Sequence, residues 1–277
     1  MNSKALILID VDNTLLDQEY NFVVGVSMLK KQIDILKNEG FYIGLNSDSA
    51  LTTLQELSVL LGLNGPIIAE KGSVISFEGV KLYTNFFTKN MKKIRKEFTD
   101  FVFDKEIATG EVTVCFGNVN ALYKMIKNKT ASNADSDTLL LINGGRESSF
   151  SFYCLQKEGG VWRIGSNKLV EFADLALEIA KKYYRDDELN IDINKDYGIF
   201  ILHHKDTKKL EAISHIKKLI ISEKIFMIGD SMSDFHDLSV IHCAVGNASE
   251  QFKLKSAYVS PGNITEGVID ILKWILP

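Results

Sequence analysis

The sequence predicts an α/β protein whose Rossmann-like, doubly wound parallel sheet is interrupted by an inserted α+β domain. Near both ends of the chain, short apolar runs alternate with amphipathic stretches, as expected of parallel strands joined by right-handed helical crossovers. In the middle, strand-like runs follow one another and this alternation is lost. The chain has 277 residues, 45% of them hydrophobic, which is enough to bury a substantial core.

The opening residues predict the first half of the sheet. Residues 5–9 are continuously apolar and end in Asp10, a pattern typical of a central strand covered on both faces. An amphipathic stretch over 22–37 predicts a helix that stops at Gly40. Three further elements continue the alternation: a strand over 41–45, a helix over 50–61 and a strand over 66–69.

The same alternation returns near the C-terminus. It predicts a helix over 208–221, strands over 224–229, 242–245 and 257–259, and a closing helix over 265–276. Between the two halves lie a hairpin over 74–83 and strand-like runs at 112–116, 139–142, 149–155 and 197–202. We therefore divide the chain into a core domain of residues 1–72 and 204–277 and an inserted domain of residues 73–203.

Charge and cysteine usage limit the class of protein. The formal net charge is −4, and no concentrated basic surface for binding nucleic acid is evident. The basic run over 89–96 is interpreted as one solvated helix face, because Met91, Ile94, Phe98 and Phe101 recur at helical spacing. The three cysteines form no Cys-x-x-Cys pair, and no apolar stretch approaches the roughly 20 residues that span a bilayer. We expect a cytoplasmic protein that binds neither nucleic acid nor a membrane.

Polar side chains follow three predicted strands at their carboxyl ends, where ligands bind in open parallel sheets. They are Asp10 and Asp12, then Ser47, then Asp230 and Asp234. Each has a plainer interpretation when taken alone: turn chemistry for the first pair, a helix N-cap around Ser47 and a helix start for Asp234. Together, however, they describe one reaction.

Four carboxylates in one place repel one another unless a hard cation lies among their oxygens. A few carboxylates together with a substrate phosphate are the usual ligands of Mg²⁺. A carboxylate nucleophile then splits phosphate-ester hydrolysis into two displacements, and a second acid protonates the leaving alcohol and later activates water. We assign the first role to Asp10 and the second to Asp12.

The motifs that carry these residues resemble, in order, the four motifs of haloacid dehalogenase superfamily phosphatases. They are residues 10–15, Ser47, a lysine within 209–213, and residues 229–234. The likeness extends to residues 66–75, similar to the segment that joins core to cap in Cof-type, type IIB members, and to residues 244–248. The resemblance implies that the inserted domain is a cap that closes over the site and selects the leaving group.

The resemblance also implies residue roles. Asp10, Asp230 and the backbone carbonyl of Asp12 would bind Mg²⁺, with Asp234 supporting the metal site through water or Lys209. Ser47 and Lys209, with Asn13 in the first loop, would hold the phosphate. Lys205 and Lys208 compete for the lysine role, and Lys209 is preferred because Ala212 and Ile213 then match the family's spacing.

Some positions depart from the family pattern. Asn13 replaces a glycine, Asp48 and Ser49 replace Gly-Arg, and Ser233 replaces a common asparagine. The carboxylate of Asp48 would oppose phosphate binding unless it points away or pairs with a cation of the cap.

The loop over 143–149 is the candidate substrate-contacting loop of the inserted domain. Its glycines permit close backbone approach, and Arg146 would bind a carboxylate or second phosphate bidentately. The loop resembles an Arg-containing cap loop of archaeal phosphoglycolate and sucrose-phosphate phosphatase-like proteins. The alternative is an ordinary hairpin with a solvated arginine.

These inferences lead to a phosphatase acting on a small phosphorylated metabolite, a sugar phosphate or a phosphoglycolate-like acid, as a monomer or homodimer. A phosphomannomutase-like hexose phosphomutase shares the core and cap type and stays an alternative. A receiver-like signalling module leaves the long insertion unexplained. A catalytically silent binding protein is the last alternative, motivated by Asp48.

Overall fold

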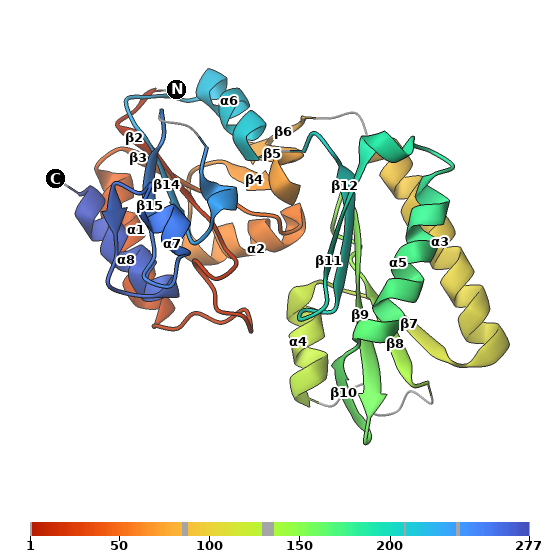
Figure 1. The fold of residues 1–277 in the computed structure, drawn as a ribbon. Coiled ribbons are helices and arrows are strands. Elements are labelled where there is room, and N and C mark those ends of the chain that lie inside the picture. Colours follow the sequence, from red (N-terminus) through yellow and green to blue (C-terminus); the bar gives the residue numbers. More distant parts are fainter. Residues whose placement is uncertain (1, 85–87, 129–135, 208, 237–238, 277) are drawn as a thin grey trace. The chain divides into compact units, whose positions relative to one another are not determined.

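The computed structural model describes residues 2–84, 88–128, 136–207, 209–236 and 239–276. The chain divides into two compact units (Figure 1). The core unit consists of Met1–Thr84 and Thr207–Pro277, and the inserted unit consists of Asn85–Asp206. Each unit is described by itself.

Within the described residues, the core unit contains an eight-stranded sheet in the order β16-β15-β14-β2-β3-β4-β5-β6. Its strands are β2 (Ala5–Ile9), β3 (Phe41–Asn46), β4 (Ile67–Ala69), β5 (Val74–Phe77), β6 (Val80–Tyr83), β14 (Ile225–Gly229), β15 (Ile241–Ala244) and β16 (Tyr258–Val259). The six strands from β16 to β4 run parallel, and β5 and β6 are antiparallel additions. A separate parallel pair joins β1 (Asn2–Ser3) to β13 (Ile221–Ser222).

Helices cover both faces of this sheet. They are α1 (Val26–Asn38), α2 (Leu51–Leu61), α6 (Lys209–Leu219), α7 (Glu250–Lys253) and α8 (Ile264–Ile275), with 3-10 turns at Glu70–Gly72 and Met232–Asp234. Ile7 and Ile9 of β2 pack in one apolar cluster with α1, α2 and α8. Leu6 and Leu8 pack in another with α6. Alternate residues of β2 thus face opposite layers, and the predicted doubly wound sheet is confirmed.

The hairpin of β5 and β6 belongs to the core unit, whereas the sequence analysis placed it in the inserted domain. β5 pairs with the edge of β4 through Ile68↔Ile75 and its two neighbouring pairs. Ile75 is buried in the cluster beneath α6. The units therefore separate after Thr84 and again after Asp206, instead of after residues 72 and 203. A hairpin pattern predicts two paired strands but not the sheet that they join.

The described inserted unit contains a sheet in the order β11-β12-β9-β8-β7, with β10 paired to β9. Its elements are α3 (Thr88–Thr109), β7 (Val112–Phe116), α4 (Val119–Asn128), β8 (Thr138–Ile142), β9 (Phe150–Glu158), β10 (Val161–Ile164), α5 (Ser166–Ala180), a 3-10 turn (Asp186–Glu188), β11 (Leu189–Asn194) and β12 (Ile199–His204). The strand pair β7–β8 is parallel and the other pairs are antiparallel.

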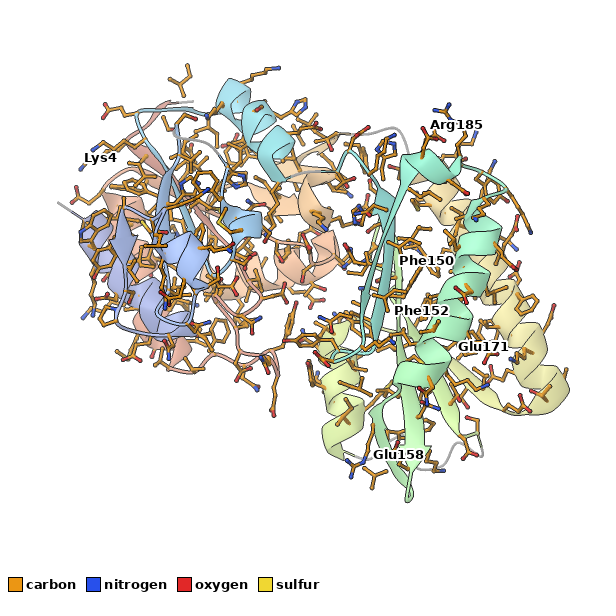
Figure 2. All side chains as sticks on the ribbon, in the orientation of Figure 1. Lys4, Phe150, Phe152, Glu158, Glu171 and Arg185 are labelled. Atoms are coloured by element: carbon orange, nitrogen blue, oxygen red, sulfur yellow. The ribbon has the colours of Figure 1, made fainter. Side chains whose placement is uncertain are left out.

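The core of the inserted unit lies between its sheet and the helices α3 and α5. Phe150 and Phe152 of β9 lie in this core (Figure 2), where Phe98 of α3 stacks on Phe152 at a ring-centroid distance of 5.0 Å. Met91 and Ile94 are also buried, as expected of the apolar face of α3. Phe101, expected on that face, is 51% exposed, because Val102 takes the buried position.

Cys154 and Cys243 are buried free thiols, and Cys115 is partly exposed. In the part of the chain that the structure describes, no helix combines the length and apolar character needed to cross a membrane.

Candidate active site

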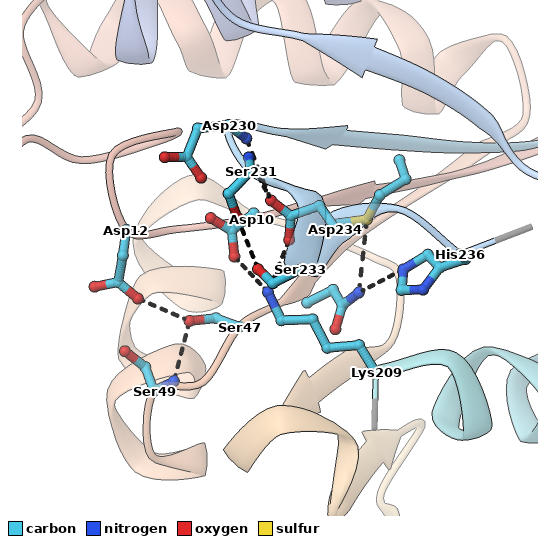
Figure 3. Close-up of polar contacts among 12 residues, drawn as sticks. Asp10, Asp12, Ser47, Ser49, Lys209, Asp230, Ser231, Ser233, Asp234 and His236 are labelled. Atoms are coloured by element: carbon cyan, nitrogen blue, oxygen red, sulfur yellow. Dashed lines mark hydrogen bonds and ion pairs between the residues drawn. The ribbon is translucent and has the colours of Figure 1, made fainter. Parts of the chain in front are cut away.

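Two neighbouring parallel strands bring the first carboxylates together. Ile9 of β2 pairs with Ile228 of β14, and the amide of Asp10 continues the ladder by donating to the Ile228 carbonyl at 2.9 Å. Asp10 therefore lies at the end of β2 beside Asp230, which follows Gly229 at the end of β14 (Figure 3). The side chain of Asp10 is only 7% exposed.

Lys209, the first residue of α6, joins two of the acids. Its Nζ lies 2.9 Å from Asp10 Oδ1 and 2.8 Å from Asp234 Oδ1, and all three side chains are at least nine-tenths buried. Lys205, by contrast, is exposed and pairs with Asp187 at 3.6 Å. Lys208 lies outside the described residues. The buried lysine beside the acids is therefore Lys209.

Asp234 orders the loop after β14. Its Oδ2 accepts hydrogen bonds from the backbone amides of Asp230 and Ser231 at 3.2 and 3.3 Å. A Cβ atom on Gly229 would lie 2.6 Å from Asp234 Cγ, so a side chain at position 229 would displace this carboxylate. Position 229 therefore needs glycine, because any larger side chain would collide with Asp234.

Asp12 faces a different set of partners. Its Oδ1 accepts a hydrogen bond from the Tyr20 hydroxyl at 2.7 Å, and its Oδ2 accepts one from Ser47 Oγ at 3.2 Å. Ser47 Oγ in turn accepts from the Ser49 amide at 3.0 Å. Ser47 is thus close to Asp12, as its place at the end of β3 predicts.

Asn13 occupies a left-handed backbone conformation with φ of 57°. Glycine adopts this conformation without steric cost and asparagine tolerates it better than most residues, which accounts for the exchange at this position. The Asn13 carbonyl accepts from Asn247 Nδ2 at 2.8 Å, and Asn247 Oδ1 accepts from the Ile264 amide at 2.8 Å. The phosphate contact expected of Asn13 stays a prediction.

A cavity of about 270 Å³ opens beside Lys209 within the core unit. Its lining residues are Asp48, Lys71, Thr207, Lys209, Ser233, Phe235 and His236. Asp48 Oδ1 is buried and makes no hydrogen bond within the described ranges of the chain. The carboxylate that departs from the family pattern is thus next to the lysine expected to bind phosphate.

Burial and mutual repulsion shift the protonation of these acids. Burial, followed by the neighbouring charge of Asp234, raises the pKa of Asp10 well above its usual value, although Lys209 opposes this. Burial and Asp234 also raise the pKa of Asp230 to about 6. Burial raises the pKa of Asp12, against the hydrogen bond from Tyr20. Burial alone would lower the pKa of Lys209, but Asp10 and Asp234 raise it well above its usual value.

The acid cluster fits a hard divalent cation. Asp10, Asp230 and Asp234 each offer a carboxylate oxygen, and these three oxygens lie within 4.8 Å of one another. An octahedral Mg²⁺ binds oxygen at about 2.0–2.1 Å, so opposite ligands are about 4 Å apart. The single lysine does not neutralise three carboxylates. The side chain of Asp12 is outside this group and turned toward Ser47 (Figure 3).

Arg146, in the inserted unit, is buried rather than solvated. The residue is 5% exposed, and one terminal nitrogen of its side chain donates to Ser149 Oγ at 3.0 Å. Its Nε has no hydrogen-bond partner among the described residues. Arg95 donates to the backbone carbonyls of Gly144, Arg146 and Ser149 and so ties the loop to α3. The interpretation as an ordinary hairpin with a solvated arginine is therefore wrong.

Two residues of the hydrogen-bond network around Asp12 were not predicted. Tyr20 lies in a polar loop without a motif, and Ser49 was considered only as a departure from the family pattern. Neither has a local signal, because their contact with Asp12 depends on how two loops meet.

A model of haloacid dehalogenase-like hydrolases matches residues 7–272. A sequence search of curated proteins found no match.

Solved structures with a similar fold align over nearly the whole chain. A Thermoplasma acidophilum protein has a TM-score of 0.62 and 20% identity, over 98% of each chain. A haloacid dehalogenase-like hydrolase from Bacteroides thetaiotaomicron has a TM-score of 0.63 and 18% identity, over 99% of this chain and 100% of that one. A trehalose-6-phosphate phosphatase related protein has a TM-score of 0.57 and 15% identity, over 98% and 96%. Identities this low support the fold alone.

Proposed function

The chain belongs to the haloacid dehalogenase-like hydrolase family, and on that premise we propose that it is a Mg²⁺-dependent phosphatase of small phosphorylated metabolites. One observation carries the proposal. A buried lysine contacts Asp10 and Asp234, and Asp230 completes a cluster of hard oxygen donors beside them. Such a site offers a nucleophile, a phosphate-binding cation and metal ligands together.

The proposed reaction begins when Lys209 and Ser47 orient the phosphate, with the first loop and Asn13 beside it. A carboxylate oxygen of Asp10 forms a bond to phosphorus as the bond from phosphorus to the leaving oxygen breaks. Asp12 gives its proton to that oxygen, which departs as an alcohol. Asp12 then takes a proton from water, whose oxygen attacks the aspartyl-phosphate and releases phosphate and the free Asp10 carboxylate.

Asp10, Asp230 and the Asp12 carbonyl would bind the metal. Asp234 would support the metal site through water or Lys209. When bound, Mg²⁺ would neutralise charge on the phosphate and lower the barrier to its transfer.

The inserted unit is the proposed determinant of the leaving group. Arg146 is the candidate for this role, because a guanidinium binds a carboxylate or second phosphate bidentately. Its Nε is buried and unpartnered among the described residues, so binding would require the loop to expose it. A sugar phosphate and a phosphoglycolate-like acid are the two candidate substrate classes, and the trehalose-6-phosphate phosphatase related protein of similar fold is consistent with the first. We propose no nucleic-acid or membrane partner, a cytoplasmic location, and a monomer or homodimer.

Removing the metal is expected to abolish activity. Phosphate release from sugar phosphates, phosphoglycolate and an aryl phosphate should require Mg²⁺ and stop with a chelator. Mg²⁺ should also raise the melting temperature, because it relieves repulsion among Asp10, Asp230 and Asp234 and binds only the folded protein. Asp230→Asn should reduce that shift.

The exposed Asp34 on α1 provides the control, since Asp34→Asn should leave both the shift and the activity unchanged. A melting temperature that Mg²⁺ does not move would contradict the metal site. Intact Mg²⁺ binding without turnover on the whole panel would contradict the phosphatase, and would favour the silent binder or the mutase.

Asp48→Asn is expected to improve substrate binding. The Asp48 carboxylate lines the same cavity as Lys209, so its charge opposes a phosphate held there. Removing it should lower KM about fivefold with little change in kcat, because one repulsive charge is worth about 1 kcal/mol even in water-like surroundings. Steady-state kinetics on the best substrate measure this, and a raised KM would instead make Asp48 a substrate-binding group.

A further inference from the structure

Tyr20 connects two loops of the core unit through its hydroxyl group. The hydroxyl lies 2.7 Å from Asp12 Oδ1 and 2.6 Å from Ser49 Oγ. Asp12 follows β2 and Ser49 follows β3, so one phenol links the ends of two neighbouring strands. The aromatic ring packs against the apolar cluster beneath α1, α2 and α8.

The direction of these hydrogen bonds follows from the donors available. A phenol has one proton, and the Asp12 carboxylate is an acceptor when ionised, so the Tyr20 proton points to Asp12. Ser49 Oγ must then donate to the Tyr20 oxygen. Ser47 Oγ donates to the second oxygen of Asp12. Both oxygens of the ionised Asp12 thus accept hydrogen bonds, Oδ1 from the phenol and Oδ2 from the serine. When Oδ2 carries the proton, Tyr20 still donates to Oδ1 and continues to fix the carboxyl group.

Hydrogen bonds within the loop fix the position of Tyr20. Asp17 closes it, with backbone bonds to Asn21 and Tyr20 and with its Oδ1 accepting from the amides of Glu19 and Asn21 at 2.9 and 2.8 Å. Tyr20 itself has φ of 62°. Bulky residues rarely adopt this left-handed conformation, which costs on the order of 1–3 kcal/mol. The contacts of its side chain offset that cost.

We propose that Tyr20 is a positioning residue that fixes Asp12 for proton transfer to the leaving oxygen, with Ser49 orienting the phenol. This inference rests on the proposed phosphatase function. The hydroxyl restricts rotation of the Asp12 carboxyl, so the acid presents its proton where the bond from phosphorus to oxygen breaks.

The test is Tyr20→Phe, assayed by kcat/KM on phosphate monoesters whose leaving groups differ in basicity. The alkoxide released from an alkyl phosphate needs the proton from Asp12, whereas p-nitrophenyl phosphate releases p-nitrophenolate, a stable anion that needs no proton. We expect kcat/KM to fall roughly 10- to 100-fold for alkyl phosphates, the loss that a small misplacement of a catalytic group causes, and less than about threefold for p-nitrophenyl phosphate. Ser49→Ala should show the same selectivity with a smaller loss.

Tyr258→Phe is the matched control, because the Tyr258 hydroxyl donates to Asp270 at 2.7 Å in the same unit but away from Asp12. It removes an equivalent phenol-carboxylate bond and should leave both substrate classes unchanged. If Tyr20→Phe lowers kcat/KM equally for alkyl phosphates and p-nitrophenyl phosphate, or for neither, the positioning role is overturned. An inactive wild-type protein would overturn the proposed function itself, and with it this inference. An unchanged Mg²⁺-induced shift in melting temperature will show that the variant keeps its fold and metal site.

Discussion

Asp10→Asn is expected to abolish turnover while leaving the protein folded. The variant loses the oxygen that attacks phosphorus, so phosphate release should fall by about 10⁴-fold or more. Its stability without metal should equal or exceed that of the wild type, because burial and Asp234 make the charged form of Asp10 unfavourable. An Asn side chain can still accept the hydrogen bond from Lys209. Activity assays and thermal unfolding in chelator measure the two effects.

Acid quenching during turnover tests the assignment more directly. The wild type should carry phosphate on Asp10, and Asp10→Asn should carry none. Asp12→Asn is the comparison variant: it should lose about 10²–10⁴-fold on alkyl phosphates yet still become labelled by an aryl phosphate. Wild-type turnover in Asp10→Asn, or label on another residue, would contradict the nucleophile assignment.

The fold was predictable where burial is continuous or periodic. β2, with five apolar residues in a row that end at Asp10, was predicted as a covered central strand. The helical period of α8 was likewise evident in the sequence. β11 was not predicted, although Leu189–Asn194 alternates apolar and polar residues, which is an edge-strand signal. The sheet joined by β5 was not predictable, because strand pairing between distant segments depends on which edge is free.

The site residues that directly follow parallel strands could be predicted from the sequence. Asp10, Asp230 and Ser47 follow neighbouring strands of a parallel sheet and must lie close together. Lys209 needed the family spacing, since three lysines lie within a short stretch and sequence alone treats them alike. Tyr20 could not be found, because its contact requires a left-handed backbone that tyrosine does not predict. The burial of Arg146 was not predictable either, because its loop is tied to a distant helix by hydrogen bonds from Arg95.

Lys209→Met is expected to damage both stability and catalysis. The ammonium group is buried between Asp10 and Asp234, and removing one partner of a buried ion pair leaves uncompensated charge. Without metal, we expect the free energy of unfolding to fall by about 3–5 kcal/mol. Phosphate release should be lost as well, because Lys209 is the cation that contacts both acids. Denaturant unfolding in chelator and a phosphate-release assay check the two effects.

The double variant Lys209→Met with Asp234→Asn separates stability from function. Asp234→Asn removes one of the two buried carboxylate charges that lose their partner in Lys209→Met. The free energy of unfolding should therefore recover in part, because the repulsion between Asp234 and Asp10 disappears. Activity should stay lost. Lys253→Met provides the control: it breaks the exposed pair with Glu250, at 2.9 Å, and such surface pairs contribute little. Turnover of Lys209→Met near the wild-type rate would contradict the proposed phosphate-binding role of Lys209. An unchanged unfolding midpoint would mean that the buried acids are protonated and do not need it.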